Sequence, residues 1–168
     1  MRLAPRLRAP GVASPTPYEG RAARLGAALR GGPLERESDA PAGAASGGVR
    51  AVLRLEGLVV LLASVAAYTQ LGAGWGAFAT LFLVPDLSFL GYLGGARTGA
   101  AVYNLVHSYI GPVALLALGA LADMPVALAI GLIWCAHIGF DRMLGYGLKY
   151  ASGFATTHLG RIGPGDPW

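Results

Sequence analysis

Four long apolar segments, joined by very short connections, dominate the part of this 168-residue chain that follows residue 48. They cover residues 52–71, 75–93, 99–121 and 125–146. Each has about 20 residues, the length that an α-helix needs to cross a hydrocarbon core about 30 Å thick. Because the connections are short, consecutive helices must lie antiparallel and next to one another. The sequence therefore predicts an all-α fold, a four-helix transmembrane bundle.

The composition supports a membrane protein and excludes several other classes. Only 13% of the residues are charged and 54% are apolar, whereas a soluble domain needs about a quarter charged residues. The single cysteine, Cys135, excludes an intrachain disulfide and a cysteine-rich zinc site, and its apolar surroundings predict a buried structural thiol. A nucleic-acid partner is not expected, because the basic residues lack interleaved aromatic residues and a folded basic face. The expected partner is the lipid bilayer.

Residues 1–48 form a region of a different kind, rich in Arg, Ala, Gly and Pro, with seven Arg and four acidic residues. No apolar period occurs there, so we predict a disordered tail that precedes a membrane domain over residues 49–168. The tail lacks the apolar stretch of a secretory signal, so no cleavage is expected. A start codon placed too far upstream would produce a similar tail.

The basic residues predict the orientation of the bundle. If the N-terminus is cytoplasmic, all thirteen Lys and Arg lie on the cytoplasmic side, and the loops at 72–74 and 122–124 carry none. This distribution follows the positive-inside rule. We therefore predict a multi-pass protein of the inner (plasma) membrane with both termini in the cytoplasm.

Three ionisable residues lie deep within three different apolar segments: Asp86, His107 and His137. A charged group at mid-bilayer costs at least about 2.5–3.5 kcal/mol, so such residues usually have a use. Counting about 1.5 Å per helical residue places all three roughly 12–15 Å from the predicted cytoplasmic face. Their common depth predicts a polar site between the helices, in the cytoplasmic half of the bundle.

Helical spacing adds further polar groups to this predicted site. Asn104 is three residues from His107, and Asp141 is four residues from His137, so each pair lies on one helix face. Glu56 lies about one turn inside the same membrane face and is a further supporting residue. On the last segment, small residues occupy the roughly opposite face and favour close approach of a neighbouring helix: Gly131, Cys135 and Gly139.

Two prolines interrupt the second and third segments. Pro85 cannot donate to the carbonyl of Leu81, and Pro112 cannot donate to that of Ser108. Carbonyls freed at membrane depth are satisfied by polar side chains or by water in a cavity lined by protein. We therefore expect polar partners near both prolines.

Three functions fit these residues. Asp86, His107, His137 and Asp141 have the nitrogen and oxygen ligands that a divalent metal ion prefers, and such an ion activates water. An enzyme of this kind would hydrolyse a lipid-like or other membrane-partitioned substrate, with Arg142 steadying an anionic group. The same residues suit a small transporter or a proton-coupled binding protein, because His titrates near neutral pH. Alternatively, the polar groups only fix helix packing, in a structural or interaction protein.

The segment after the fourth apolar stretch is dense in polar, aromatic and glycine residues. Arg142 and Lys149 stand at the predicted inner interface, where cations and aromatic rings commonly gather. Gly145 and Gly147 weaken the helix end, so the segment is able to fold across the mouth of the site. His158 is more typical of an exposed residue than of a ligand, but it is placed to close the cluster from below.

Four strings in the chain carry a resemblance to a known family: PDLSFLGYL at 85–93, YNLVHSY at 103–109, IWCAHIGFDRMLGYGLKY at 133–150 and THLGRIG at 157–163. They resemble a family of small bacterial membrane proteins catalogued as domain of unknown function 4260. The resemblance covers about residues 49–163 and implies a four-helix membrane protein without an assigned activity. The placement of His and Asp is also weakly similar to that of membrane-bound metal-dependent hydrolases. The residues that match the pattern of domain of unknown function 4260 include Glu56, Asp86, Tyr103, Asn104, His107, His137, Asp141, Arg142 and His158.

Overall fold

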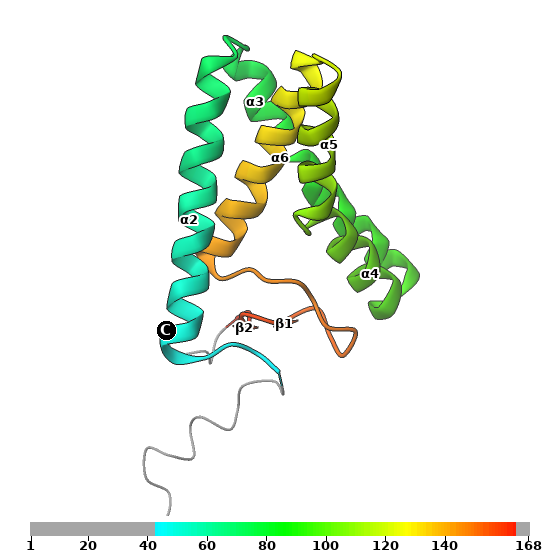
Figure 1. Ribbon diagram of the computed structural model, residues 1–168. Helices are drawn as coiled ribbons and strands as arrows, with labels where there is room; N and C mark the ends of the chain where they lie inside the picture. The colour runs from blue at the N-terminus through cyan, green and yellow to red at the C-terminus, as the bar shows by residue number, and fades with distance from the viewer. Residues whose placement is uncertain (1–42, 164–168) are drawn as a thin grey trace, which may run out of the picture. The chain divides into compact units, whose positions relative to one another are not determined.

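The structure is a computed structural model, and it describes residues 43–163 (Figure 1). Its four candidate membrane spans are Gly47–Gln70, Trp75–Gly94, Ala96–Leu121 and Pro125–Leu144. This confirms the predicted all-α, four-helix membrane fold. Residues 1–42 of the predicted tail lie outside the described residues. The elements in chain order are α2 (Gly47–Gln70), α3 (Trp75–Phe82), the 3₁₀-helix η2 (Val84–Gly94), α4 (Ala96–Val106), α5 (Ile110–Leu121), α6 (Pro125–Leu144), β1 (Thr156–Thr157) and β2 (Gly160–Arg161).

Helix α6 is the centre of the fold, with α2 on one side and α5 on another (Figure 1). Glycines permit the close contact with α2. A Cβ atom on Gly139 would lie 2.7 Å from the backbone nitrogen of Leu61, and one on Gly57 would lie 2.8 Å from that of Met143. On the α5 side, a Cβ atom on Gly131 would lie 2.8 Å from Leu116. The predicted small-residue face of the last segment therefore packs against its neighbours, as expected, and Cys135 is buried.

The second span is not the continuous α-helix that the apolar segment predicted. Helix α3 ends at Phe82, and the chain continues from Val84 as η2. Pro85 explains the change, because its ring clashes with the carbonyl four residues earlier and it lacks an N–H. The tighter pattern begins where the N–H of Asp86 donates to the carbonyl of Leu83, at 3.2 Å. At about 1.5 Å per α-helical and 2.0 Å per 3₁₀ residue, the two pieces still cover about 34 Å.

The third span is also interrupted, between α4 and α5, at residues 107–109. Pro112 has no N–H to donate to the carbonyl of Ser108, four residues earlier, and its ring clashes with that carbonyl in a regular α-helix. The carbonyls left free just before the break find partners on α6. Trp134 Nε1 donates to the carbonyl of Val106 at 2.7 Å, and Arg142 Nη2 donates to that of His107 at 3.2 Å. The expectation of polar partners near this proline is thus met, one and two residues before Ser108.

The residues after α6 form a folded segment, whereas the sequence predicted a polar tail there. Strands β1 and β2 pair as an antiparallel hairpin, with Thr156 opposite Arg161 and Thr157 opposite Gly160. Lys149 forms an isolated bridge with Thr157. This segment also holds the last residues of the predicted N-terminal tail. The N–H of Ala45 donates to the carbonyl of His158 at 2.7 Å, so the folded domain begins before residue 49.

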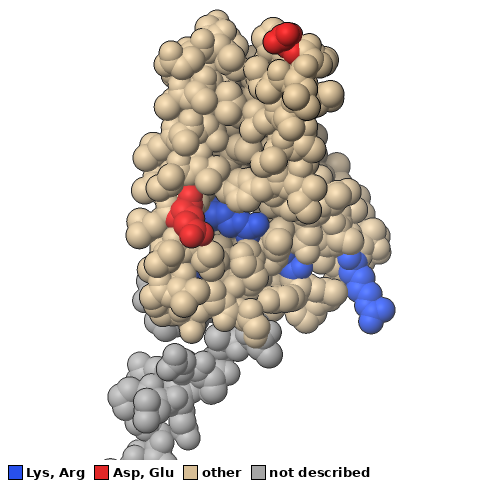
Figure 2. Space-filling model, viewed as in Figure 1, with Lys and Arg blue, Asp and Glu red and all other residues tan. Residues whose placement is uncertain are grey.

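The surface has the character expected of membrane-spanning helices. Large apolar side chains are exposed on every span, such as Val59 on α2 and Leu105 on α4. In the view of Figure 2 the visible Lys and Arg lie in the lower part of the molecule, whereas the upper part shows acidic but no basic side chains. The described cations belong to α2, α4, α6 and the segment that follows them: Arg50, Arg54, Arg97, Arg142, Lys149 and Arg161.

Candidate metal centre

Four of the predicted site residues converge at the breaks of the second and third spans. Asp86 comes from η2, His107 from the end of α4, and His137 and Asp141 from adjacent turns of α6. One ligand atom from each lies within 4.8 Å of all the others. Both imidazoles are buried, and the Asp141 side chain is 15% exposed. The Asp86 side chain is 41% exposed, so the cluster is accessible from its side.

The distances within this cluster suit a shared metal ion. His107 Nε2 lies 3.7 Å from Asp86 Oδ1 and 3.5 Å from Asp141 Oδ2. The corresponding distances from His137 Nε2 are 3.7 and 3.8 Å, and the two Nε2 atoms are 3.1 Å apart. Tetrahedral ligands at about 2.0–2.1 Å from a zinc ion would be about 3.4 Å from one another. Five of the six pairs of ligand atoms are thus close to the spacing of a coordination shell, and all four atoms lie within 4.8 Å of one another.

The protonation of His107 favours the same interpretation. Its Nδ1 lies 3.1 Å from the carbonyl oxygen of Tyr103, and a carbonyl only accepts, so Nδ1 carries the hydrogen. The Nε2 lone pair then points into the cluster. A backbone carbonyl behind a histidine is the usual arrangement at metal ligands, where it fixes the tautomer and the ring orientation. The ring of Tyr103 also stacks on the imidazole, with centroids 3.8 Å apart.

His137 is held differently. Its Nδ1 is buried and has no hydrogen-bond partner among residues 43–163. The edge of the ring packs against Phe82, with centroids 5.2 Å apart. Since the hydrogen of His107 is on Nδ1, its Nε2 can only accept. The Nε2–Nε2 contact is therefore a hydrogen bond when His137 Nε2 carries a hydrogen and donates it. A cation at the centre would require this hydrogen to move to Nδ1, which has no other bond to lose.

The supporting residues have different positions from one another. Tyr103 donates its hydroxyl to Asp141 Oδ2 at 3.3 Å, and so orients one carboxylate of the cluster. Asn104 does not face the cluster, because its amide bonds the backbone of Lys149 in both directions, at 2.8 and 2.7 Å. Glu56 is exposed on α2 and is not part of the converging group. A role for Glu56 in the site stays a prediction.

Arg142 and His158 form a layer next to the cluster. Arg142 Nη2 donates to the carbonyl of His107, and its Nη1 lies 3.3 Å from His158 Nε2. His158 is half-buried and accepts a hydrogen bond from the N–H of Leu148 at 2.8 Å. Burial and the nearby Arg142 cation lower the pKa of His158, against the smaller effect of the Leu148 hydrogen bond. Both terminal nitrogens of Arg142 already contact protein, and its role toward an anion stays a prediction.

Lys149 is buried within the protein, whereas the sequence predicted a position at the membrane interface. The side chain is buried and donates to the carbonyl of Phe154 at 2.9 Å. Its ammonium lies 3.7 Å from the centroid of Phe154 and 4.9 Å from that of Tyr103. Burial lowers the pKa of Lys149, although the Asp141 carboxylate opposes the shift. These contacts fix the segment after α6 beneath Tyr103. In the sequence, the aromatic residue Phe154 close to Lys149 is the one feature that indicated such burial.

A comparison with protein families identifies the family of this chain. The family model described as Domain of unknown function (DUF4260) matches residues 50–162. The chain belongs to this family. No curated protein and no solved structure matches it. The DUF4260 match contains all four residues of the cluster as well as Tyr103, Arg142 and Lys149. The family description assigns no activity, so the function has to be argued from the site itself.

Proposed function

We propose that this DUF4260 protein is a divalent-metal-dependent hydrolase that acts on a substrate partitioned into the membrane. The observation that supports the proposal is the convergence of two imidazole nitrogens and two carboxylate oxygens, 3.1–3.8 Å apart where they face one another. Two nitrogen and two oxygen ligands suit zinc and several other first-row divalent ions.

The residues divide the work of such a site. His107, His137 and Asp141 are the more buried ligands and would coordinate the ion from the interior of the protein. Asp86 would coordinate it from the accessible side. A divalent ion lowers the pKa of a water molecule and polarises a carbonyl or phosphoryl oxygen, which is the chemistry of hydrolysis. Tyr103 keeps Asp141 oriented, and the Tyr103 carbonyl keeps the His107 lone pair directed inward. Arg142, next to the cluster, is the candidate for steadying an anionic group.

The position of the cluster supports a membrane-partitioned substrate. All four residues belong to candidate membrane spans. A substrate that is itself apolar would reach this depth without the desolvation cost that a soluble polar molecule pays.

Metal analysis of the purified protein tests the proposal. We expect about one divalent ion for each wild-type chain, since the four ligands form one site. His107→Ala and His137→Ala should each lose most of it, because each removes a buried ligand, whereas Glu56→Gln should retain it. Wild-type protein that binds no divalent ion, even when zinc or manganese is supplied, would contradict the proposal.

The direct His107–His137 hydrogen bond favours a second candidate, a proton-coupled transporter or binding protein. Two imidazoles 3.1 Å apart, flanked by two carboxylates, are able to pass a proton between them. This candidate predicts no bound metal but a pH-dependent ligand affinity that His137→Ala abolishes. If neither metal nor ligand binds, the cluster only fixes helix packing, as in a structural or interaction protein.

The orientation of the chain in an inner membrane, with both termini in the cytoplasm, is part of the same proposal. In a Cys135→Ala background, Gly74→Cys places a thiol in the α2–α3 loop and Ala96→Cys places one at the first residue of α4, and both positions are exposed. A membrane-impermeant maleimide applied to intact cells should label Gly74→Cys, and should label Ala96→Cys only after permeabilisation. The cysteine-free background is the control, and the reverse labelling pattern would contradict the orientation.

A further inference from the structure

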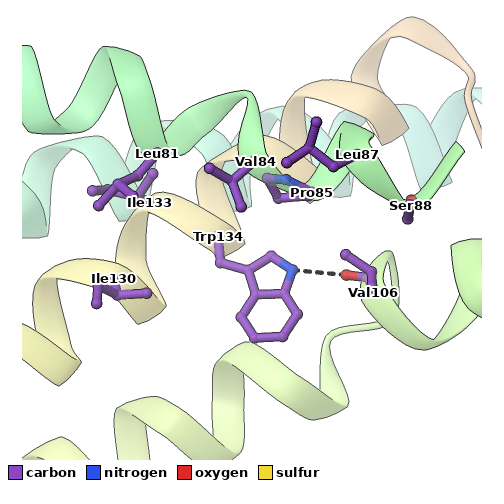
Figure 3. A pocket seen from close by; sticks show the side chains of 9 residues that line it. All are labelled: Leu81, Val84, Pro85, Leu87, Ser88, Val106, Ile130, Ile133 and Trp134. Carbon is purple, nitrogen blue, oxygen red and sulfur yellow. Dashed lines mark hydrogen bonds between the residues drawn. The ribbon is translucent and has the colours of Figure 1, made fainter. Parts of the chain in front are cut away.

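An apolar cavity of about 400 Å³ lies beside the cluster, between the second span, the end of α4 and helix α6. Eight of its nine lining residues are apolar, and Ser88 is the exception. Figure 3 shows Leu81 and Ile130 toward one end of the cavity, and Ser88 with Val106 toward the other. The indole of Trp134 lies between these ends, and its N–H is already bonded to the carbonyl of Val106. Trp134 therefore presents only an apolar ring to the cavity.

The polar end of this cavity lies against the His107 ring, on the side of Nδ1, which faces away from the cluster. Ser88 Oγ lies 3.5 Å from His107 Nδ1. Two lining residues, Pro85 and Val106, directly precede Asp86 and His107 in the sequence. A third, Ile133, lies one helical turn before His137. The cavity is thus lined by residues next to or one helical turn from three of the ligands, on all three elements that build the candidate metal centre, but not by the ligands themselves.

The apolar lining also reaches the outer surface of the spans. Val84 is 46% exposed, Leu87 62% and Ile130 37%, and all three belong to candidate membrane spans. In a bilayer this side of the cavity faces hydrocarbon. A lipid chain would therefore enter from the membrane without crossing water.

We infer that this cavity takes a single hydrocarbon chain of the substrate and leaves its polar head at the Ser88 and His107 end, beside the Asp86–His107–His137–Asp141 cluster. This rests on the proposed function and names its substrate class, a single-chain amphiphile. If a methylene group needs about the 30 Å³ of a water molecule in the liquid, the volume suits one chain of about a dozen carbons. Two chains of membrane length do not fit.

The physical origin of selectivity follows from the membrane location. A chain that leaves the bilayer for this cavity gains little from the hydrophobic effect, because lipid tails are as apolar as the cavity lining. The affinity must then come from the polar head at the cluster and from packing against Trp134. A lipid with two chains would have to leave its second chain in the bilayer, whereas the cavity accommodates the chain of a single-chain molecule whole.

Quenching of Trp134 by a bromine-labelled chain tests this inference directly. Trp75→Phe and Trp168→Phe leave Trp134 as the sole tryptophan of the full-length protein. Titration with a terminally brominated fatty alcohol of about a dozen carbons, in an unbrominated detergent, should quench its fluorescence saturably. An excess of the unbrominated alcohol should restore the fluorescence, and a brominated two-chain lipid should bind more weakly, because its second chain has no place in the cavity.

Variants locate the bound chain. Val84→Phe combined with Ile130→Phe fills the apolar part of the cavity, away from the cluster, and should weaken the apparent affinity about ten-fold or more. Val59→Phe combined with Leu62→Phe makes similar changes at exposed positions on α2, outside the cavity, and should leave the affinity unchanged. Quenching that rises linearly, without competition by unbrominated alcohol, would overturn the inference.

The titration is independent of the metal, because the fatty alcohol is neutral and the protein can be stripped with a chelator first. Saturable quenching in a protein that never binds metal would leave the chain site standing and overturn the proposed hydrolase. Metal binding without saturable quenching would do the reverse.

Discussion

Zinc added to chelator-stripped protein should raise its free energy of unfolding by about 4 kcal/mol when free zinc exceeds its dissociation constant a thousand-fold. The ion binds the folded chain, where the four ligand atoms already lie within 4.8 Å of one another. The unfolded chain has no such arrangement. Thermal denaturation in detergent micelles, followed by circular dichroism at increasing zinc, measures the effect.

Single variants distinguish a metal site from a packing cluster in this experiment. His137→Ala should lose most of the zinc-dependent stabilisation. Asp86→Asn should lose much of it too, yet be at least as stable as the wild type without zinc, because it removes one of two neighbouring carboxylates. Glu56→Gln, an exposed carboxylate outside the cluster, is the matched control and should respond to zinc like the wild type. If Asp86→Asn unfolds more easily without zinc and zinc stabilises no variant, the cluster serves packing alone.

Replacing Gly57 by alanine should destabilise the protein by about 1–3 kcal/mol or more. The added methyl group would lie 2.5 Å from the Cβ atom of Arg142 and 2.9 Å from the carbonyl oxygen of Gly139. Part of this contact is with backbone, so helices α2 and α6 would have to separate. Unfolding in mixed micelles of increasing denaturing detergent gives the change in stability.

Gly76 provides the control for this substitution. It lies in α3, and a Cβ atom there would meet nothing within 4 Å. Gly76→Ala should therefore be neutral, or stabilise by up to about 1 kcal/mol through the better helix propensity of alanine. Equal effects of the two substitutions would show that the α2–α6 contact is looser than described. Since Arg142 contacts the His107 carbonyl, Gly57→Ala should also weaken zinc binding.

The spans and the cluster could be predicted because both depend on regularities of the sequence. Apolar length determines the spans, and helical spacing brings His137 and Asp141 onto one face of α6. Asp86, His107 and His137 come together despite the breaks in two helices, because each break lies close to Asp86 or His107 and so shifts these residues little. The small-residue face of α6 was likewise readable from the spacing of Gly131 and Gly139.

Other features depend on tertiary contacts that no periodicity encodes. Pro85 and Pro112 indicated strain, but a proline can kink a helix, end it or start a 3₁₀ segment, and neighbouring packing decides among these. The partner of Asn104 is a backbone group 45 residues away, in a segment whose own pattern predicted no strand. The burial of Lys149 depends on that same segment folding back, so a position at the membrane interface was the natural expectation.

The uneven packing of the helices has a mechanical consequence. Helix α4 packs mainly on η2, whereas α2 and α5 pack on α6 (Figure 1). Asp86 and His107 lie on the first group and His137 and Asp141 on the second, so an ion would cross-link the two groups. The cavity is lined from both groups as well. A rotation of the α4–η2 pair away from α6 would move Asp86 and His107 away from His137 and Asp141 and would weaken the binding of the ion. The same rotation would widen the entrance of the cavity for a hydrocarbon chain.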